Sequence, residues 1–291
     1  MLYDGIDVFN DYRSAVSQKN TDAVVIVAPT KYHREIAVAA AENKKHVFCE
    51  KPMAMNPEEC EEIINACKRN NVKLQVGFMR RFDSSFIEAK SRIDSGEIGK
   101  PVLIKSLTHG PSIPRPWMYD IRKSNGPLAE VSSHDIDTAR WMSGSEFKTA
   151  YAIGNNLRTP DAVGEYPDYY DNVIMACRME NGVQAMIEGA VSVRYGYDAR
   201  LEILGEKGIL FVGKNNQDNV VVVNKENGIH TPHIQSWTSL FCEAYKKEME
   251  SFAGSIVSGR EPEVTGFDGL QAVKAVNAGN ESILSGESVS F

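Results

Sequence analysis

The sequence predicts an α/β protein of two domains, in which a parallel sheet covered by helices is followed by an α+β domain with a large, mostly antiparallel sheet. Apolar runs first alternate with segments of helical spacing. Glycines and a proline then punctuate the chain near residue 98. Beyond them, short strands bounded by turns follow one another directly, as in antiparallel sheets. We therefore expect domains at residues 1–98 and 99–291.

The first domain is expected to contain three strands separated by two helices. The apolar run DAVVIVAP precedes KYHREIAVAAAENKK, which has helical spacing, and HVFCEKP is apolar again. Asn56 is a good N-cap for the second helix, because Pro57 follows at its first position and two acidic residues occupy its first turn. The run KLQVGF is the third strand. Strands that are apolar on both faces indicate a parallel sheet, here half of a doubly wound domain.

The second domain is expected to be a succession of strands closed by two helices. The expected strands are PVLIKSLTHG, KTAYAIGN, DNVIMACRME, GVQAMIEGAVSV, DARLEILGE, KGILFVG and NVVVVN. Several alternate apolar with polar residues, as a sheet with one wet face should, and Asn181-Gly182 is a strong hairpin signal. We expect the closing helices near residues 236–258 and 268–284, and an earlier helix that starts at Pro127.

Composition argues against several classes of function. The formal net charge is -7 and the basic residues are scattered, which argues against a nucleic-acid or anionic-membrane surface. No apolar run reaches the length of a membrane span, and the chain does not begin like a signal peptide. The five cysteines show no Cys-x-x-Cys spacing and mostly lie in apolar segments, which indicates reduced thiols in the cytoplasm. We find no metal-ligand or P-loop spacing.

Two charged residues and a proline, Glu50-Lys51-Pro52, lie at the end of the second strand of the first domain. The carboxyl ends of parallel strands are where open α/β sheets bind ligands. Partial burial there would lower the pKa of Lys51 and make its amine a proton donor, a proton acceptor or a clamp for a hydroxyl group. The alternative is a surface ion pair that contributes little to stability.

The end of the first strand has the same geometry, with Pro29, Thr30 and His33 closing the strand and opening a helix. Backbone N–H groups there would face a phosphate or a nicotinamide ribose. The alternative for His33 is an ordinary helix residue. The first and second strands thus both indicate a ligand at one edge of the sheet.

A third candidate group lies in SNGPLAEVSSHDIDTARWMSG. Glu130 and His134 are four residues apart and Asp137 is three further on, so they share one face of a helix that begins at Pro127. A carboxylate beside an imidazole holds it in one tautomer and raises its basicity, which suits a proton acceptor. The alternative is an ordinary helix with a solvated polar face.

These segments together carry a resemblance to a known family. A strand that ends in Glu-Lys-Pro, followed by VGFMRRFD, SNGPLAEVSSHDID and VRYGYDARLEILGEKG, resembles the glucose-fructose oxidoreductase, inositol dehydrogenase and MocA family of nicotinamide-dependent oxidoreductases. The chain looks most like the inositol dehydrogenase branch, through FMRRFD, HDID-AR and YGYDARLE. The resemblance implies a Rossmann-type first domain, and a second domain that binds substrate and forms a homo-oligomer through its open sheet, between Lys148 and Asn224.

The resemblance also implies roles for individual residues. Lys51 is implied to contact the substrate hydroxyl and the cofactor, and His134 to remove the hydroxyl proton. Glu130, the third implied catalytic residue, stands where these enzymes usually have Asp, so its carboxylate is moved by about one methylene. Arg81, Tyr197 and Asp198 are implied to line the substrate pocket, as is Arg80. The implied cofactor-binding residues are Pro29, Thr30, His33, Glu50, Lys51 and Pro52.

The reaction expected from this resemblance is hydride transfer between the ring alcohol of a polyol or sugar and NAD or NADP. The partner is then a small polyol or sugar, with no nucleic acid and no membrane. Some relatives use a tightly held nicotinamide transiently for glycoside cleavage or epimerisation, which is an alternative for this chain.

One departure from the family is large. Its members begin with a strand, a Gly-x-Gly-x-x-Gly turn, a helix and a second strand, whereas the only early glycine here is Gly5. GIDVFNDYRSAV looks like the family's third strand and the segment after it, so we expect an N-terminally truncated Rossmann-type sheet with an exposed edge at DAVVIVAP. Either the reading frame starts late, or the chain begins at Met1 with an impaired cofactor site. In the second case a cofactor-deficient sugar-binding or assembly module is the alternative.

Overall fold

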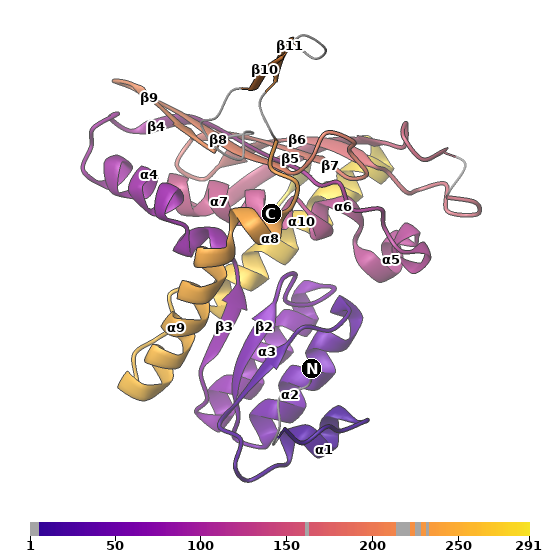
Figure 1. The fold of residues 1–291 in the computed structure, drawn as a ribbon, viewed down its shortest axis with the longest axis vertical. Coiled ribbons are helices and arrows are strands. Elements are labelled where there is room, and N and C mark those ends of the chain that lie inside the picture. Colours follow the sequence, from indigo (N-terminus) through magenta and orange to yellow (C-terminus); the bar gives the residue numbers. More distant parts are fainter. Residues whose placement is uncertain (1–5, 161–162, 214–221, 225–227, 231–232) are drawn as a thin grey trace. The chain divides into compact units, whose positions relative to one another are not determined.

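The chain divides into two compact units (Figure 1). The computed structural model describes residues 6–160, 163–213, 222–224, 228–230 and 233–291. One unit ends at Gly77 and also takes in Met249–Leu270, and the other comprises Phe78–Glu248 with Gln271–Phe291. This division differs from the boundary expected at residue 98, because α4 (Ser84–Asp94) packs against strand β9 (Ile209–Val212) of the second unit.

The first unit contains a parallel sheet of three strands in the order β1-β2-β3. The strands are β1 (Ala23–Ile26), β2 (His46–Glu50) and β3 (Leu74–Gly77). They are connected by η1 (Thr30–Tyr32), α2 (His33–Glu42) and α3 (Pro57–Asn70). Asn56 caps α3 by accepting a hydrogen bond from the backbone N–H of Glu59 at 2.9 Å, as its sequence predicts. The predicted parallel Rossmann-type sheet is thereby confirmed.

The segment before β1 corrects one expectation. The strand expected at the start of GIDVFNDYRSAV is wrong, because residues 6–9 have no regular structure and Asp11 caps a short helix, α1 (Tyr12–Val16). An isolated strand would leave its backbone N–H and C=O groups without a ladder partner. In the described residues β1 pairs with β2 alone, and 76 % of Val27 is exposed just beyond it. The exposed edge expected at DAVVIVAP is therefore present.

The second unit is built on a sheet of seven strands in the order β12-β5-β6-β7-β4-β8-β9. All neighbours are antiparallel except β4 and β7, which are parallel. The strands not yet given are β4 (Pro101–His109), β5 (Phe147–Asn155), β6 (Asn172–Met179), β7 (Gln184–Ala190), β8 (Asp198–Gly205) and β12 (Val289–Ser290). The predicted large, mostly antiparallel sheet is confirmed.

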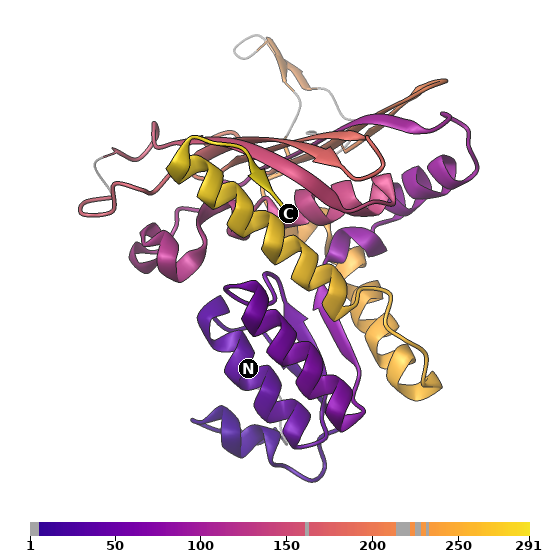
Figure 2. The same ribbon diagram turned by 180° about the vertical axis from the view of Figure 1, so that it is seen from behind.

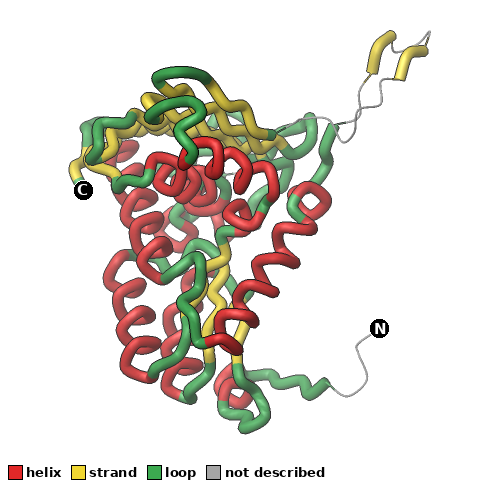
Figure 3. The backbone as a smooth tube through the Cα atoms, turned by 90° about the vertical axis from the view of Figure 1, so that its left-hand side faces the viewer, coloured by secondary structure: helices red, strands yellow, loops and turns green. Residues whose placement is uncertain are grey.

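One face of this sheet is covered by helices, and the other, which we call the open face, carries no helix among the described residues. Figure 3 shows the helices of this unit on a single side of its strands, and Figure 2 shows α10 (Gly266–Ser285) running beneath the strands. Burial alternates along the strands accordingly: Val173 and Met175 of β6 are buried, whereas 53 % of Ile174 between them is exposed. Tyr151 and Ile153 of β5 are likewise exposed. This alternation is the predicted pattern of a sheet with one wet face.

The predicted helices occur, but two of them are broken. The helix expected from Pro127 is divided into α6 (Gly126–Glu130) and α7 (Ser133–Ser143), because the N–H groups of Val131 and Ser132 both donate to the carbonyl of Pro127. The helix expected at 236–258 is divided at Phe241 into α8 (Trp237–Leu240) and α9 (Cys242–Ser258). The helix expected at 268–284 corresponds to α10.

The remaining elements are short. They are η2 (Met79–Phe82), η3 (Pro116–Tyr119), α5 (Ile121–Ser124) and the antiparallel pair β10 (Val222–Asn224) and β11 (Gly228–His230). Of the expected strand NVVVVN, residues 219–221 lie outside the described residues. No helix in the described part of the chain is long and apolar enough to cross a membrane.

Candidate active site

The candidate residues of the first unit lie at the carboxyl ends of β1 and β2. Glu50 ends β2, and its carboxylate accepts a hydrogen bond from the backbone N–H of Lys51 at 3.1 Å. The carboxylate packs over Gly77 of β3, where a Cβ atom would lie 2.9 Å from Glu50 Oε2. Burial raises the pKa of Glu50, and the positive charge of Lys51 opposes that shift. A charged pair thus lies at the sheet edge where parallel sheets bind ligands.

His33 connects the ends of the first two strands. Its Nε2 lies 2.7 Å from the carbonyl oxygen of Ala28, and its Nδ1 lies 2.9 Å from that of Pro52. The residue is buried, as is Thr30 nearby. Burial lowers the pKa of His33, and the two carbonyl groups oppose that shift. Because both ring nitrogens contact the protein, His33 fixes the edge of the sheet.

Replacing His33 with Gln is expected to destabilise the protein and to change how stability depends on pH. Losing one buried hydrogen bond costs about 1–3 kcal/mol when its partner stays unsatisfied. With the folded pKa below 6.5, the stability linked to His33 is fully present above pH 6.5 and is lost as the pH falls through the lowered folded value. Urea unfolding over a pH series measures both effects.

His46, whose pKa burial also lowers, remains in both proteins and serves as the internal control. The difference between the two pH profiles therefore reports His33 alone. Equal slopes of unfolding free energy against pH in the two proteins would show that His33 does not carry this dependence.

The same edge fits the nicotinamide end of a dinucleotide. Thr30, Glu50 and Lys51 come from two adjacent strands, and hydroxyl, carboxylate and ammonium groups suit the hydroxyls of a ribose and a carboxamide. The sequence has no glycine between residues 6 and 76, so the turn after β1 is no glycine-rich phosphate loop. The described residues of this unit thus fit the nicotinamide end and offer no cradle for the pyrophosphate.

The candidate residues of the second unit centre on the first turn of α7. His134 is buried there, and its ring meets the ring of Phe78 edge-on, with centroids 5.9 Å apart. Asp135, the next residue, accepts hydrogen bonds from Arg80 Nη1 at 2.7 Å, Ser106 Oγ at 2.6 Å and Thr108 Oγ1 at 2.6 Å. The interruption of the helix before Ser133 means that Glu130 and His134 are not on one continuous helix, as the spacing argument assumed.

Arg81 and Asp137 form a second ion pair beside the first. Arg81 Nε donates to Asp137 Oδ2 at 2.9 Å, and Arg81 Nη2 donates to Asp137 Oδ1 at 2.6 Å. Arg140, one turn further along α7, pairs with Glu146 through two hydrogen bonds. The FMRRFD and HDID motifs are therefore joined through their arginines and aspartates.

Arg80 lies in the core of the second unit. Its guanidinium is stacked near Phe86 and Phe241, at 5.5 and 5.9 Å from the ring centroids. It also hydrogen-bonds Tyr197, whose pKa is raised by burial while the charge of Arg80 opposes that shift. The resemblance implied that Arg80 lines a substrate pocket. In the structure Arg80 instead forms a buried ion pair with Asp135.

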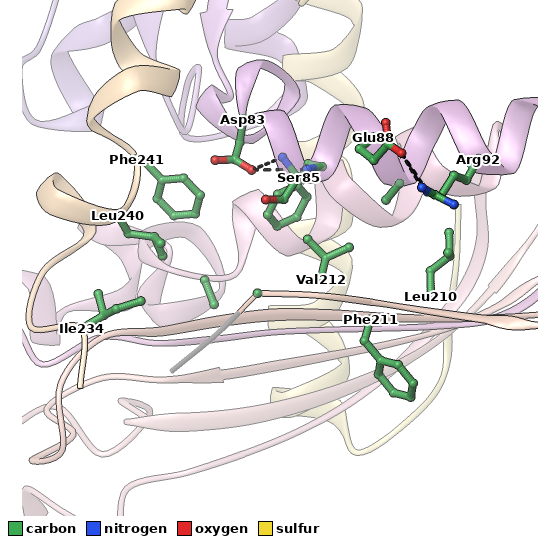
Figure 4. Close-up of a pocket in the computed structure, with 14 residues that line it drawn as sticks. Asp83, Ser85, Glu88, Arg92, Leu210, Phe211, Val212, Ile234, Leu240 and Phe241 are labelled. Carbon is green, nitrogen blue, oxygen red and sulfur yellow. Dashed lines mark hydrogen bonds and ion pairs between the residues drawn. The ribbon is translucent and has the colours of Figure 1, made fainter. Parts of the chain in front are cut away.

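A cavity of about 600 Å³ is lined by residues of α4 and β9 and by these two aromatic rings (Figure 4). Phe86 and Phe241 belong to its wall, and α4 supplies a polar rim that includes Asp83 and the Glu88–Arg92 ion pair. Asp83 is occupied as the N-cap of α4, where it accepts from the backbone N–H groups of Ser85 and Phe86. None of the predicted site residues lines this cavity.

Tyr197 and Asp198 do not act together. Tyr197 contacts Arg80 and Phe241, which lie on the covered side of the sheet. Successive side chains of a strand point to opposite faces. Asp198 accordingly accepts hydrogen bonds from Arg200 of β8, at 2.9 and 3.0 Å, and from the hydroxyl of Tyr195 at 3.1 Å.

The break between α6 and α7 lies in close contact with β7. A Cβ atom at Gly189 would lie 2.1 Å from Ser132 Oγ. We expect Gly189→Ala to destabilise the protein by about 1–3 kcal/mol, because overpacking forces Ser132 and the start of α7 away from the sheet. Thermal unfolding measures the loss.

Ser132→Gly removes the clashing oxygen and is expected to recover most of that stability when combined with Gly189→Ala. Gly182→Ala, in the hairpin turn, serves as a comparison. Nothing lies within 4 Å of the added Cβ there, so a loss of stability in this variant comes from the backbone φ of +90°, which disfavours alanine. If the Gly189→Ala protein is as stable as the wild-type protein, the close approach of Ser132 to Gly189 is contradicted.

Comparison with known proteins adds to this geometry. Residues 86–211 match the model of the GFO/IDH/MocA C-terminal domain, and residues 3–78 match that of the oxidoreductase family, NAD-binding Rossmann fold. This chain belongs to the Gfo/Idh/MocA family. The expected enzyme class, an oxidoreductase with a nicotinamide cofactor, is thereby confirmed. Because the first domain retains its match, an impaired cofactor site is not shown.

Gfo/Idh/MocA relatives cover most of the chain. It is 35% identical to the uncharacterized oxidoreductase YrbE of Bacillus subtilis, over 98% of this chain and 82% of the relative. It is 31% identical to myo-inositol 2-dehydrogenase of Thermotoga maritima, over 94% and 81%. The structure of scyllo-inositol dehydrogenase from Lactobacillus casei with bound NAD(H) and scyllo-inositol has a TM-score of 0.88 and 32% identity, over 97% of this chain and 84% of that one.

Proposed function

We propose that this chain transfers a hydride between the ring alcohol of an inositol-like polyol and a nicotinamide cofactor. The observation that carries the proposal is the likeness, over 97% of the chain, to a dehydrogenase structure that holds NAD(H) and scyllo-inositol. Lys51 and His134, the residues with the required chemistry, are both present. The net charge of -7 suits a neutral substrate better than an anionic one.

In this proposal each residue has one task. His134 accepts the proton of the substrate hydroxyl as the C–H bond breaks, and Lys51 donates a hydrogen bond to the same oxygen. The nicotinamide ring, when bound, takes up or returns the hydride. Glu130 supplies a carboxylate for the substrate or for His134, and Arg81 and Tyr197 bound the substrate site.

The remaining sites have supporting roles in the proposal. Pro29, Thr30, Glu50 and Pro52 hold the nicotinamide end of the cofactor, on an edge fixed by His33. Asp198 lies on the opposite face of the sheet from Tyr197, where it orients Arg200 and Tyr195 through its hydrogen bonds, so the proposal gives it no part in the substrate site. In the proposal the unit that ends at Gly77 binds the cofactor, and the unit that begins at Phe78 binds the substrate.

Two properties of the whole molecule belong to the proposal. The open face of the seven-stranded sheet carries exposed apolar side chains such as Tyr151, Ile153 and Ile174, which supports a homo-oligomer formed through this face. All five cysteines are free thiols and four of them are buried, which supports a cytoplasmic location.

The direct test mixes the protein with NAD⁺ or NADP⁺ and a panel of inositols and hexoses, and follows the absorbance of the reduced nicotinamide. We expect turnover with at least one inositol. Calorimetric titration of each cofactor runs in parallel, so that binding and chemistry are separated. Binding of a polyol with no nicotinamide affinity and no turnover would contradict the proposal and favour a sugar-binding module.

A further inference from the structure

A short segment after β3 is attached to the start of α7 at three successive points. Phe78 contacts the ring of His134, Arg80 pairs with Asp135, and Arg81 pairs with Asp137. The side chains of Arg80 and Asp135 are 1 and 0 % exposed, so this pair is sealed from solvent. The residue next to the proposed base therefore carries the most buried ion pair of the attachment.

A buried ion pair of this kind contributes little net stability. Removing two charges from water costs several kcal/mol per ion, and apolar residues of similar volume often serve as well or better. Here the cost is offset by satisfying Asp135 with three donors from two elements, Arg80 of η2 and the pair Ser106 and Thr108 of β4. Such an arrangement fixes the orientation of the Asp135 carboxylate, because each hydrogen bond tolerates only a narrow range of positions.

The donors fix α7 along its own axis as well as against the sheet. Ser106 and Thr108 lie two residues apart on the covered face of β4, and they bind different oxygens of the Asp135 carboxylate. Arg80 also donates to Thr108, at 2.5 Å, which closes a ring of contacts. A slide of α7 by one residue, about 1.5 Å, would break all of these bonds and would carry His134 with it.

We propose that Arg80 and Asp135 are positioning residues that fix His134 for proton transfer. This inference rests on the proposed function, because His134 has a base's task only in that reaction. Neither residue needs to touch the substrate. They act on the reaction through the position and orientation of the neighbouring imidazole. Their removal is therefore expected to change kcat more than substrate binding.

The main test compares Asp135→Asn with the double variant Arg80→Met and Asp135→Asn. The single variant leaves the buried guanidinium without a counter-charge and is expected to be unstable. The double variant removes both charges, and Met packs between Phe86 and Phe241 in place of the guanidinium. We expect the double variant to fold, with kcat about a hundredfold lower and KM changed by less than about twofold.

Glu146→Gln is the matched control, because it weakens the ion pair of Arg140 near the other end of the same helix. We expect it to keep wild-type kcat. A folded double variant with wild-type kcat overturns the inference, as does an equal loss of kcat in the control. If the double variant does not fold, Thr108→Val carries the test, since it removes one donor to Asp135 at constant shape. A kcat about tenfold lower at unchanged KM supports the inference, and wild-type kcat overturns it.

A readout without turnover separates this inference from the proposed function. The ring C–H signals of His134 are assigned in NMR spectra by comparison with His134→Asn. We expect them to shift in the folded double variant, or in Thr108→Val where that variant is used, and to stay in place in Glu146→Gln. An inactive wild-type protein that shows this pattern means that the proposed function fails and the positioning inference stands. Unmoved signals overturn the inference whatever the activity.

Discussion

Replacing His134 with Asn is expected to lower kcat/KM for the polyol by about 10²–10⁴-fold, which is the usual contribution of a positioned general base. Asn can hydrogen-bond the substrate hydroxyl but cannot take up its proton. The loss should be in kcat, because the substrate's other contacts remain. Steady-state kinetics with the best polyol of the panel, at saturating cofactor, measures it.

His46→Asn is the matched control for this prediction. His46 begins β2, at the end of the strand opposite Lys51, and its ring accepts a hydrogen bond from the backbone N–H of Lys73 at 2.9 Å. An asparagine side chain can accept the same bond, so activity should stay at the wild-type level. A His134→Asn protein with most of its wild-type kcat would remove this residue from the mechanism.

Lys51→Met is expected to reduce kcat/KM by about 10²–10³-fold, because the variant loses a cationic donor to the oxygen that gains negative charge. The substitution has a second consequence at Glu50. The charge of Lys51 opposes the upward shift that burial gives to the pKa of this carboxyl group, so its removal should raise that pKa further. Kinetics as a function of pH detects both effects.

Lys68→Met, on the exposed surface of α3, is the control for removing a lysine charge from the same unit. The double variant of Lys51 and His134 adds a sharper criterion. If both side chains act on one oxygen, the double variant should lose little more activity than the worse single variant. Fully additive losses would mean that the two residues serve independent steps.

Much of the fold is predictable from local patterns in the sequence. Apolar runs and alternation identified the strands of both units, and Asn56 with Pro57 marked the start of α3. The strand order of the large sheet could not be predicted from such patterns. Strand β4 lies between β7 and β8 and is parallel to β7. No local pattern encodes a pairing such as Leu103 with Gln184, since it depends on the whole set of strands competing for neighbours.

The breaks in the elements were beyond the same reasoning. The helix at Pro127 has continuous helical spacing, and its interruption at Ser132 lies against Gly189, which is distant in sequence. The strand expected at the start of GIDVFNDYRSAV rested on the family resemblance, whereas its Asp and Asn residues are unfavourable in strands. The helix is interrupted where it packs closely against a strand that is distant in sequence, and the segment expected as a strand leads into helix α1.

The candidate site was predictable in its chemistry and less so in its contacts. The motifs indicated Lys51 and His134 directly. The pairing of Arg80 with Asp135 joins residues 55 apart in sequence, and its signal was the polar Ser106 and Thr108 on the face of β4 that packs inward. Polar side chains at the period of a buried strand face indicate a partner that must satisfy them, although they do not name it.

The central position of β4 has a consequence for how the protein is made. This strand is synthesised early, yet its two neighbours, β7 and β8, leave the ribosome only much later. Until then the backbone N–H and C=O groups along its edges have no ladder partners, so folding is governed by distant contacts and is expected to be slow. The unpaired strand is therefore expected to be prone to aggregation during that interval.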